Sequence, residues 1–418
     1  MCIIFILYQV HPTYPLIIAS NRDETLNRPT ESMKLRSIAI DATTETATAT
    51  LNDDGDNNTN RQQDEEFDYL QTTRRRRRAR NQQQQQQRSY LAGRDLVCGG
   101  TWLALDVSSM MKVVDLDDDD DGSSIARGGA DCTLDVVNNN AEKKDDDISS
   151  NDNKSTTPSL LKWIAITNYR EKEDHGRPSR GELLTEYITA QTTQTSCAQS
   201  FLKELQQKGQ QYNGFNLLVG DDTGIYYYSN RSVVQDNDDG NKQGGCHDDD
   251  INNTTTPSTV QRLMPGRIYG LSNALLDTPW PKVQRGKELL EQLLLEEEEQ
   301  KQKNESNNNS NNSNNSKNSS NNSSSLKQLH EKLMTILHDT TQPTNDADLP
   351  NTGIGLHSER HLSSIFVPVD TFMGREYGTR SSTSVVMDLE GCVSVLERSW
   401  SPEKKVDDEW FCFRQENE

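Results

Sequence analysis

The chain has 418 residues, a hydrophobic fraction of only 31% and a formal net charge of -21 at pH 7. This acidity argues against a nucleic-acid partner, because phosphate groups are bound by a basic face. Long tracts of Gln, Asn, Ser and Asp cannot bury enough apolar surface to fold, so we expect a single domain over residues 1–418 that is interrupted by disordered insertions.

The N-terminal residues predict two buried strands, at 2–8 and 16–20, joined by a turn that contains Pro12 and Pro15. The composition then changes to Thr, Asp, Asn, Arg and Gln, which predicts a first insertion at residues 33–90. A short strand is expected near 101–105, followed by a second insertion at residues 107–159.

The middle of the chain predicts a strand, two helices and a hairpin. Their expected bounds are 163–169 for the strand, 180–188 and 197–206 for the helices, and 215–219 and 225–229 for the hairpin. A polar loop at residues 235–256 is the third expected insertion.

The C-terminal part predicts a strand at 267–273 and helices at 281–295 and 326–338, which flank a fourth insertion at residues 299–325. A hairpin at 381–389 and 392–398 and an edge strand at 410–413 complete the pattern. Because strands and helices are segregated along the chain, we expect an α+β fold with helices on the outer faces of antiparallel sheets.

Cys2 is the most informative single residue. Removal of Met1 would leave a thiol and a free α-amine on Cys2, and an amine with a pKa of about 7.7–8.0 can act as the general base for the thiol. Arg22 and Asp23 end the strand that pairs with the Cys2 strand, so they could orient both groups or form a structural ion pair. Equally, Cys2 could be a small buried apolar residue.

The remaining candidate residues are polar side chains near the ends of strands. Asn168 and Asn213 could donate hydrogen bonds to an oxyanion, with Asn273 as a weaker third candidate, or they could serve in turns. Asn21, Asn273 and Arg380 are candidate ligand-binding residues, and Arg380 could instead pair with an acidic neighbour. The seven scattered cysteines include no Cys-x-x-Cys pair, so we expect no metal site, no disulfide scaffold and a reducing compartment.

Several blocks of the sequence resemble the NRDE family, and in particular its eukaryotic transport and Golgi organisation branch. These blocks are Met1-Cys2-Ile3-Ile4, residues 16–27 with Arg28-Pro29-Thr30, Gly99 to Leu103, Thr167-Asn168-Tyr169, Arg180 to Leu183, Tyr212 to Leu217, Tyr269 to Asn273, Thr278-Pro279-Trp280 and Tyr377 to Thr383.

The resemblance implies a four-layer αββα sandwich of the N-terminal-nucleophile hydrolase type. It also implies a role in Golgi organisation, protein secretion and lipid or haem homeostasis, without an agreed substrate. Because a shared fold does not imply a shared reaction, two hypotheses stay open. The first is a factor that binds a lipid-like or haem-like ligand, and the second is an amidohydrolase with Cys2 as nucleophile.

We expect no cofactor, so that haem would enter only as a transported ligand. The first apolar run lacks a basic leading region, and no segment reaches 18 consecutive apolar residues, so we expect neither a signal peptide nor a transmembrane span. The expected location is therefore the cytoplasm, with Golgi or mitochondrial association as a further option.

Overall fold

The computed structural model describes residues 2–39, 87–113, 160–190, 197–231, 259–308, 318–372, 374–401 and 407–415. Two antiparallel sheets form its centre. The first sheet has the order β11 (Arg267–Leu271), β1 (Ile3–Tyr8), β2 (Leu16–Thr25), β13 (Arg375–Met387), β14 (Val393–Ser399), β15 (Asp407–Gln415) and β6 (Met110–Lys112), and β12 (Asp370–Phe372) pairs with β13.

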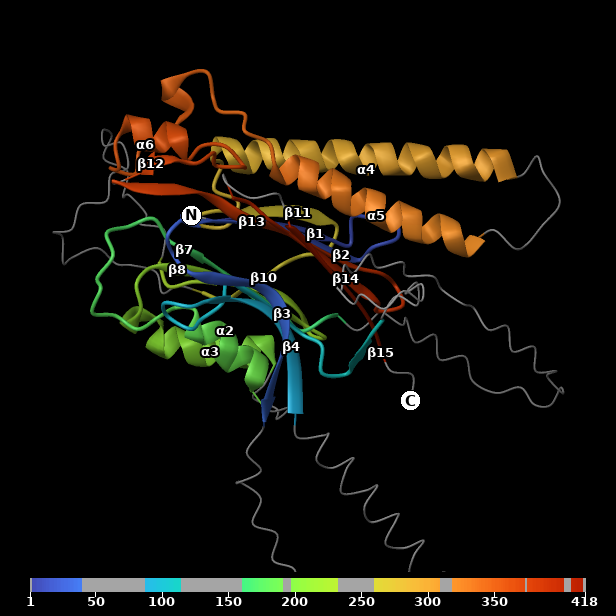
Figure 1. Cartoon of the computed structure of the whole chain (residues 1–418), viewed down its shortest axis with the longest axis horizontal. Coiled ribbons are helices and arrows are strands. Elements are labelled where there is room, and N and C mark those ends of the chain that lie inside the picture. Colours follow the sequence, from blue (N-terminus) through green and yellow to red (C-terminus); the bar gives the residue numbers. More distant parts are fainter. Residues whose placement is uncertain are drawn as a thin grey trace, which may run out of the picture.

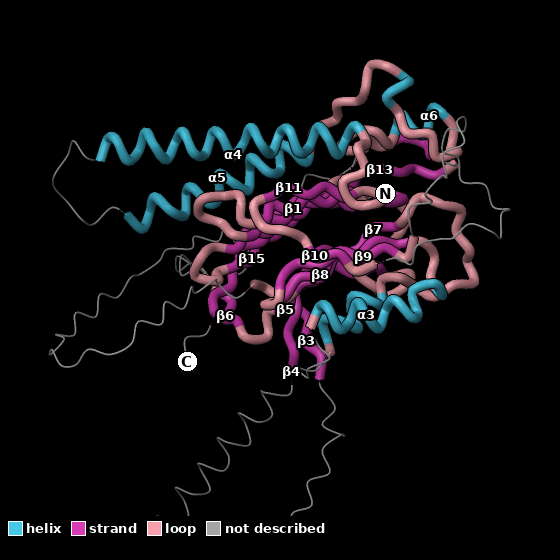
Figure 2. Tube along the Cα trace, turned by 180° about the vertical axis from the view of Figure 1, so that it is seen from behind, coloured by secondary structure: helices cyan, strands magenta, loops and turns pink. Residues whose placement is uncertain are grey.

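The second sheet has the order β10 (Gln261–Arg262), β9 (Gly224–Ser229), β8 (Phe215–Asp221), β7 (Trp163–Asn168), β5 (Leu103–Asp106), β4 (Gln87–Asp95) and β3 (Thr30–Ala39). Helices α4 (Pro281–Asn308) and α5 (Asn318–Leu337) lie on the outer side of the first sheet, and α2 (Glu182–Thr189) and α3 (Ala198–Lys208) lie on the outer side of the second (Figures 1 and 2). The mixed α+β fold expected from the sequence is therefore confirmed.

The alternation of side chains along a strand explains why the first strands are apolar on both faces. In β1, Ile4 and Ile6 belong to the core between the two sheets, together with Trp163 of β7. The intervening Phe5 and Leu7 pack with residues of α4 and α5. Both faces of the first sheet are thus covered, which fits the nearly continuous hydrophobic run seen in the sequence.

Helix α4 approaches β1 closely because Gly286 has no side chain. A Cβ atom at this position would lie 2.0 Å from the ring of Phe5, so no other residue fits without displacing the ring. A short helix, α6 (Leu356–His361), lies beside β12 at one end of the first sheet (Figure 1). Within the described part of the chain, no helix combines the length and hydropathy needed to cross a membrane.

The expected insertions were too wide at their ends. Strands β3 and β4 occupy both ends of the expected insertion 33–90, and β6 lies within 107–159. The ends of α4 and α5 lie within 299–325, whereas 235–256 falls outside the described residues. Polar composition concealed these elements: β3 mixes Glu, Ser, Lys and Arg with a few apolar residues, of which Met33 is buried while Leu35 is exposed.

His330 joins α5 to the first sheet. Its ring is fully buried, with Nδ1 2.6 Å from the hydroxyl of Ser384 in β13 and Nε2 2.8 Å from the hydroxyl of Ser394 in β14. Burial lowers the pKa of His330 from 6.5 to about 3, so the ring is neutral in the folded protein. The unfolded chain therefore binds a proton below pH 6.5 that the folded chain does not bind.

We predict that this difference makes the protein less stable as the pH falls from 6.5 towards 3, by up to about 1.4 kcal/mol per pH unit. Replacing the ring by His330→Gln removes this contribution. The loss of unfolding free energy between pH 7 and pH 5, measured by urea denaturation, should then shrink by about 2 kcal/mol. The exposed His175→Gln serves as control, and an unchanged pH dependence in His330→Gln would contradict the prediction.

Candidate functional site

The thiol of Cys2 lies beside the end of β2. Its Sγ atom accepts a hydrogen bond from the backbone N–H of Asp23, as expected if the first two strands pair and bring these residues together. Burial raises the pKa of the Cys2 thiol above its usual 9.0, whereas the charges of the N-terminus and of Arg22 lower it and that of Asp23 raises it. The thiol is therefore mostly protonated at neutral pH and needs a nearby base to react.

Asp23 is held firmly by β13. Its Oδ1 atom accepts a hydrogen bond of 2.7 Å from the hydroxyl of Thr379, and its backbone carbonyl accepts one of 3.0 Å from the hydroxyl of Tyr377. Burial raises the pKa of Asp23, while the charges of the N-terminus and Lys282 and the hydrogen bond from Thr379 lower it. Asp23 therefore contributes a fixed negative charge or proton carrier next to the thiol.

Lys282 enters the same cluster from the first turn of α4. The side chain is 2% exposed, and its Nζ atom has no hydrogen-bond partner among the described residues. Burial lowers the pKa of Lys282 from 10.5 to about 8, against the opposing effects of Asp23 and Cys2. An amine in this state can exchange a proton near neutral pH or place a positive charge beside a developing oxyanion.

An ion pair borders Lys282. Arg170 donates a hydrogen bond of 2.6 Å to Glu359 of α6, and its guanidinium lies 4.5 Å from the centre of the Trp280 ring. Glu359 also accepts hydrogen bonds from the backbone and hydroxyl of Thr352. Burial lowers the pKa of Arg170 to about 10, and the charges of Arg170 and Glu359 both act on Lys282. The cluster thus carries charges of both signs.

A series of hydrogen bonds connects Cys2 with the segments that carry Asn273 and Asn168. Ser272 donates to the carbonyl of Cys2 at 3.1 Å, and the neighbouring Asn273 donates from Nδ2 to the carbonyl of Asn168 at 2.8 Å. The backbone N–H of Arg170 donates to the carbonyl of Asn273 at 2.7 Å. Asn168 itself is exposed at the end of β7, so its side chain is accessible to a ligand.

Two candidate residues instead brace the backbone. The Nδ2 atom of Asn21 donates to the carbonyls of Leu337 and Ile365, and its Oδ1 atom accepts from the hydroxyl of Ser382. The side-chain amide of Asn213 accepts from the N–H of Asp174 and donates to its carbonyl. The structure thus places each amide against fixed backbone partners, and no hydrogen bond among the described residues joins either one to Cys2.

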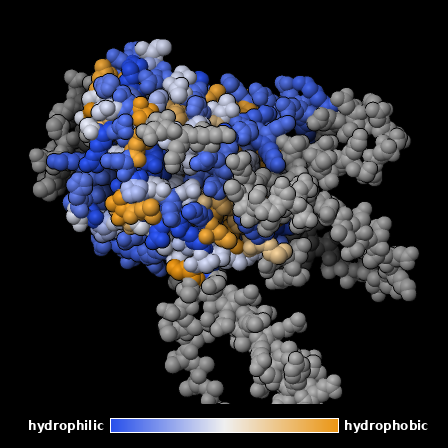
Figure 3. Space-filling model, viewed as in Figure 1, coloured by the Kyte–Doolittle hydropathy of each residue, from blue (hydrophilic) through white to orange (hydrophobic). Residues whose placement is uncertain are grey.

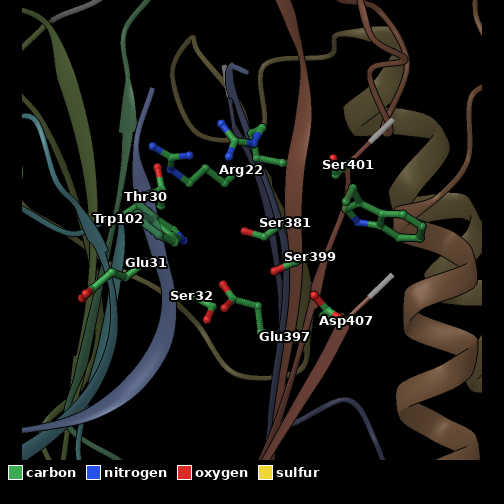
Figure 4. Close-up of a pocket in the computed structure, with 12 residues that line it drawn as sticks. Arg22, Thr30, Glu31, Ser32, Trp102, Ser381, Glu397, Ser399, Ser401 and Asp407 are labelled. Carbon is green, nitrogen blue, oxygen red and sulfur yellow. The ribbon is translucent and has the colours of Figure 1, made fainter. Parts of the chain in front are cut away.

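The two candidate arginines line a different space, a cavity of about 230 Å³ between the sheets (Figure 4). The guanidinium of Arg22 stacks 4.4 Å above the centre of the Trp102 ring. Arg380 donates from Nη1 to the carbonyls of Thr25, Leu26 and Arg28. Arg22 therefore separates from its neighbour Asp23, because consecutive side chains of β2 point to opposite faces of the sheet.

One group among the described residues offers three atoms of the kinds that bind metals: Asp388, Glu390 and Cys392, at the turn between β13 and β14. Asp388 already accepts hydrogen bonds from the backbone N–H groups of the other two residues. This arrangement is the ordinary hydrogen bonding of an acidic turn and carries no metal assignment.

Sequence reasoning missed Lys282, Thr379 and the Arg170–Glu359 pair. One signal was present for Lys282. A positive charge in the first turn of a helix is unfavourable beside the positive end of the helix dipole, so a lysine directly after Pro281 indicates a role other than stabilising the helix. Thr379 lay inside the block at Tyr377 to Thr383 but had no distinguishing chemistry. Glu359 lies 189 residues after Arg170 in the sequence, so no local pattern reveals that the two residues pair.

Comparison with known proteins adds an independent observation. The family model described as "Transport and Golgi organisation 2" matches residues 1–42 and 155–402, a region that leaves out the block from Gly99 to Leu103. A transport and Golgi organization protein 2 homolog from Homo sapiens is 30% identical over 245 residues, which cover 57% of this chain and 68% of that protein. The homolog from Bos taurus is 29% identical over 247 residues, with coverages of 57% and 68%.

We predict that Asp23→Asn lowers the pKa of the Cys2 thiol, because the substitution removes a negative charge that opposes the thiolate. The amide keeps an oxygen that can accept the hydrogen bond from Thr379. Alkylation of Cys2 by iodoacetamide at pH 7, followed by peptide mass spectrometry, should become severalfold faster. The exposed Cys98 in the same sample provides the internal control, and an unchanged or slower rate at Cys2 would contradict the prediction.

Proposed function

We propose that this chain, which belongs to the transport and Golgi organisation 2 family, uses the thiol of Cys2 to cleave a carbon–nitrogen amide bond. One observation carries the proposal: the thiol accepts a hydrogen bond from the backbone N–H of Asp23, and the ammonium of Lys282, which has no hydrogen-bond partner among the described residues, lies in the same buried cluster. The packing of two antiparallel sheets between helices supports an N-terminal-nucleophile type of fold, which we include in the proposal.

The active form arises by removal of Met1, which frees the α-amine of Cys2. That amine takes the thiol proton, and the thiolate forms a bond to the amide carbon, which leaves a negative charge on the carbonyl oxygen. Lys282 stabilises this oxyanion, with the exposed amide of Asn168 as a second donor. Collapse of the intermediate breaks the carbon–nitrogen bond, and the α-ammonium returns its proton to the departing amine.

A thioester on Cys2 remains after the amine departs. Water then attacks the thioester carbon while the same α-amine accepts a proton, and the carbon–sulfur bond breaks to regenerate the thiol and release a carboxylic acid. Asp23 orients the two groups on Cys2 through its backbone N–H and its fixed carboxyl. No cofactor takes part in this scheme.

The relatives are named for transport and Golgi organisation, and we propose that this chain acts in the same setting of Golgi organisation and protein secretion.

A lipid-like or haem-like ligand fits the cavity beside Arg22 less well than a small polar ligand. Its volume of about 230 Å³ lies below the roughly 300–1,000 Å³ of pockets that enclose drug-sized ligands. On the face shown in Figure 3, hydrophobic residues form several separate patches among hydrophilic ones.

We predict that Cys2→Ala lowers kcat/KM at least about 10³-fold, because the nucleophile is lost. Activity would be measured as fluorophore release from aminocoumarin amides that carry acetyl, butyryl and dodecanoyl groups. Intact-mass analysis of the active protein should show that Met1 is absent. Cys98→Ala should keep full activity as the matched control.

A variant with one alanine inserted between Met1 and Cys2 keeps the thiol but moves the free amine away from it, and it should also be inactive. Retention of Met1 in an active wild-type protein would contradict the mechanism, because the nitrogen of Cys2 would then be an amide. A Cys2→Ala protein that keeps its full cellular function would favour the ligand-binding hypothesis instead.

We predict a second signature in the pH dependence of kcat. The pKa of Lys282 is about 8, so its ammonium is present below this pH and is lost as the pH rises through it. The wild-type kcat should therefore fall above about pH 8. Lys282→Gln should lack this decline and show a kcat at pH 7 that is about 10²–10³-fold lower.

The control is Lys287→Gln, on the same helix, where the lysine pairs with Asp277 at 3.1 Å. This variant should keep the wild-type pH profile. If Lys282→Gln retained the decline above pH 8, Lys282 would not be the group that titrates.

A further inference from the structure

The cavity beside Arg22 has walls from both sheets. Arg22, Ser381 and Glu397 come from β2, β13 and β14 of the first sheet, whereas Glu31 and Trp102 come from β3 and the residues just before β5 of the second. Figure 4 shows Trp102 on one side and Ser381, Ser399 and Glu397 facing it from the other. The space is thus a gap in the packing between the two sheets.

Three residues that line this cavity each carry a buried polar atom without a hydrogen-bond partner among the described residues: Arg22 Nη1, Trp102 Nε1 and Glu397 Oε1. Buried polar groups are almost always paired, and each one left without a partner costs about 1–3 kcal/mol. Arg22 and Glu397 are 6% and 0% exposed, so bulk water does not reach these side chains freely. The coincidence of all three in one cavity points to a bound partner.

Glu397 is fixed in place by its other oxygen. Its Oε2 atom accepts a hydrogen bond of 2.5 Å from the backbone N–H of Met33, which joins β14 to β3 across the gap between the sheets. Burial raises the pKa of Glu397 to about 7, against the hydrogen bonds from the N–H of Met33 and the hydroxyl of Ser381 and the charge of Arg22. Oε1 has no hydrogen-bond partner among the described residues, and the carboxylate is ionised at slightly basic pH, so this oxygen can accept a hydrogen bond from a ligand.

The free atoms differ in chemistry. Arg22 Nη1 and Trp102 Nε1 are donors and favour an anionic oxygen, whereas ionised Glu397 Oε1 is an acceptor and favours a cationic N–H group. The ion pairs that Arg22 makes with Glu24 and Asp95 are long, at 3.8 and 4.0 Å, so its charge is only partly compensated. A ligand that supplies both an anion and a cation would satisfy all three atoms.

We propose that this cavity binds a small zwitterion of the free α-amino acid class, with its carboxylate on Arg22 and Trp102 and its ammonium on Glu397. A volume of about 230 Å³ suits a ligand of this size. Pairing each buried charge with an opposite charge of the ligand offsets the cost of burying it. The proposal does not rest on the chemistry of Cys2, so Cys2→Ala should bind the ligand as the wild type does.

The test is isothermal titration calorimetry on the full chain at pH 8, where Glu397 is ionised, with L-leucine, L-alanine and L-glutamine as probes. Each probe is paired with an analogue that lacks one charge. For leucine these are 4-methylpentanoate, which lacks the ammonium group, and 3-methylbutylamine, which lacks the carboxylate. We expect at least one amino acid to bind, and both of its single-charge analogues to bind at least about tenfold more weakly.

Two isosteric variants locate the site. Trp102→Phe removes only the indole N–H donor, and Glu397→Gln removes the negative charge but keeps an oxygen for Met33. Each should weaken binding of the amino acid about tenfold or more. Glu390→Gln is the matched control, because Glu390 is exposed in the turn between β13 and β14 and is not among the residues that line the cavity, and it should bind normally.

The outcomes separate the alternatives. If no amino acid binds at concentrations up to about 10 mM, any dissociation constant is weaker than roughly millimolar. The cavity would then hold only water, and the proposal would be overturned. Equal binding of 4-methylpentanoate, unaffected by Glu397→Gln, would overturn the zwitterion in favour of a simple anion. Binding that survives both Trp102→Phe and Glu397→Gln in folded protein would place the ligand elsewhere.

Discussion

The pairing of β2 with β1 on one side and β13 on the other controls both candidate sites. Because side chains alternate along a strand, Asp23 and Arg22 face opposite sides of the first sheet, and a one-residue slip in register would exchange them. The bulge in β13 at Arg380 fits this division: Thr379 lies opposite Asp23, and Ser381 lies opposite Arg22. A single strand thus supplies the thiol cluster with its carboxyl group and the cavity between the sheets with its guanidinium.

Both sites hold buried charged groups. Among the residues that the structure describes, Lys282 Nζ, Arg22 Nη1 and Glu397 Oε1 are buried without a hydrogen-bond partner. Other buried side chains are satisfied, as when the side-chain amide of Asn21 bonds to two carbonyls and a hydroxyl, although single atoms such as His11 Nε2 and Trp163 Nε1 also lack a partner among the described residues. Local departures from hydrogen-bond satisfaction in a well-packed protein are characteristic of places that bind or react.

The sequence predicted what depends on local pattern. The apolar runs of β1 and β2 and their short turn were sufficient to place Cys2 beside Asp23, and the segregation of strands and helices indicated an α+β fold. Contacts between distant segments could not be predicted: the position of Lys282 in the first turn of a helix is unusual, but it does not indicate that α4 brings this side chain near Asp23. Nor does composition separate the polar strands β3 and β4 from the polar tract between them. The catalytic roles of Cys2, Arg22, Asp23, Asn168 and Asn213 stay predictions.

The β3–β4 hairpin explains how the chain tolerates a long glutamine-rich tract. Ala39 and Gln87 are register partners at the far end of this hairpin, so the chain leaves the folded core and re-enters it at facing positions. A change in the number of residues between these two positions therefore need not displace any strand of the second sheet, because both ends of the segment meet the sheet at one register pair.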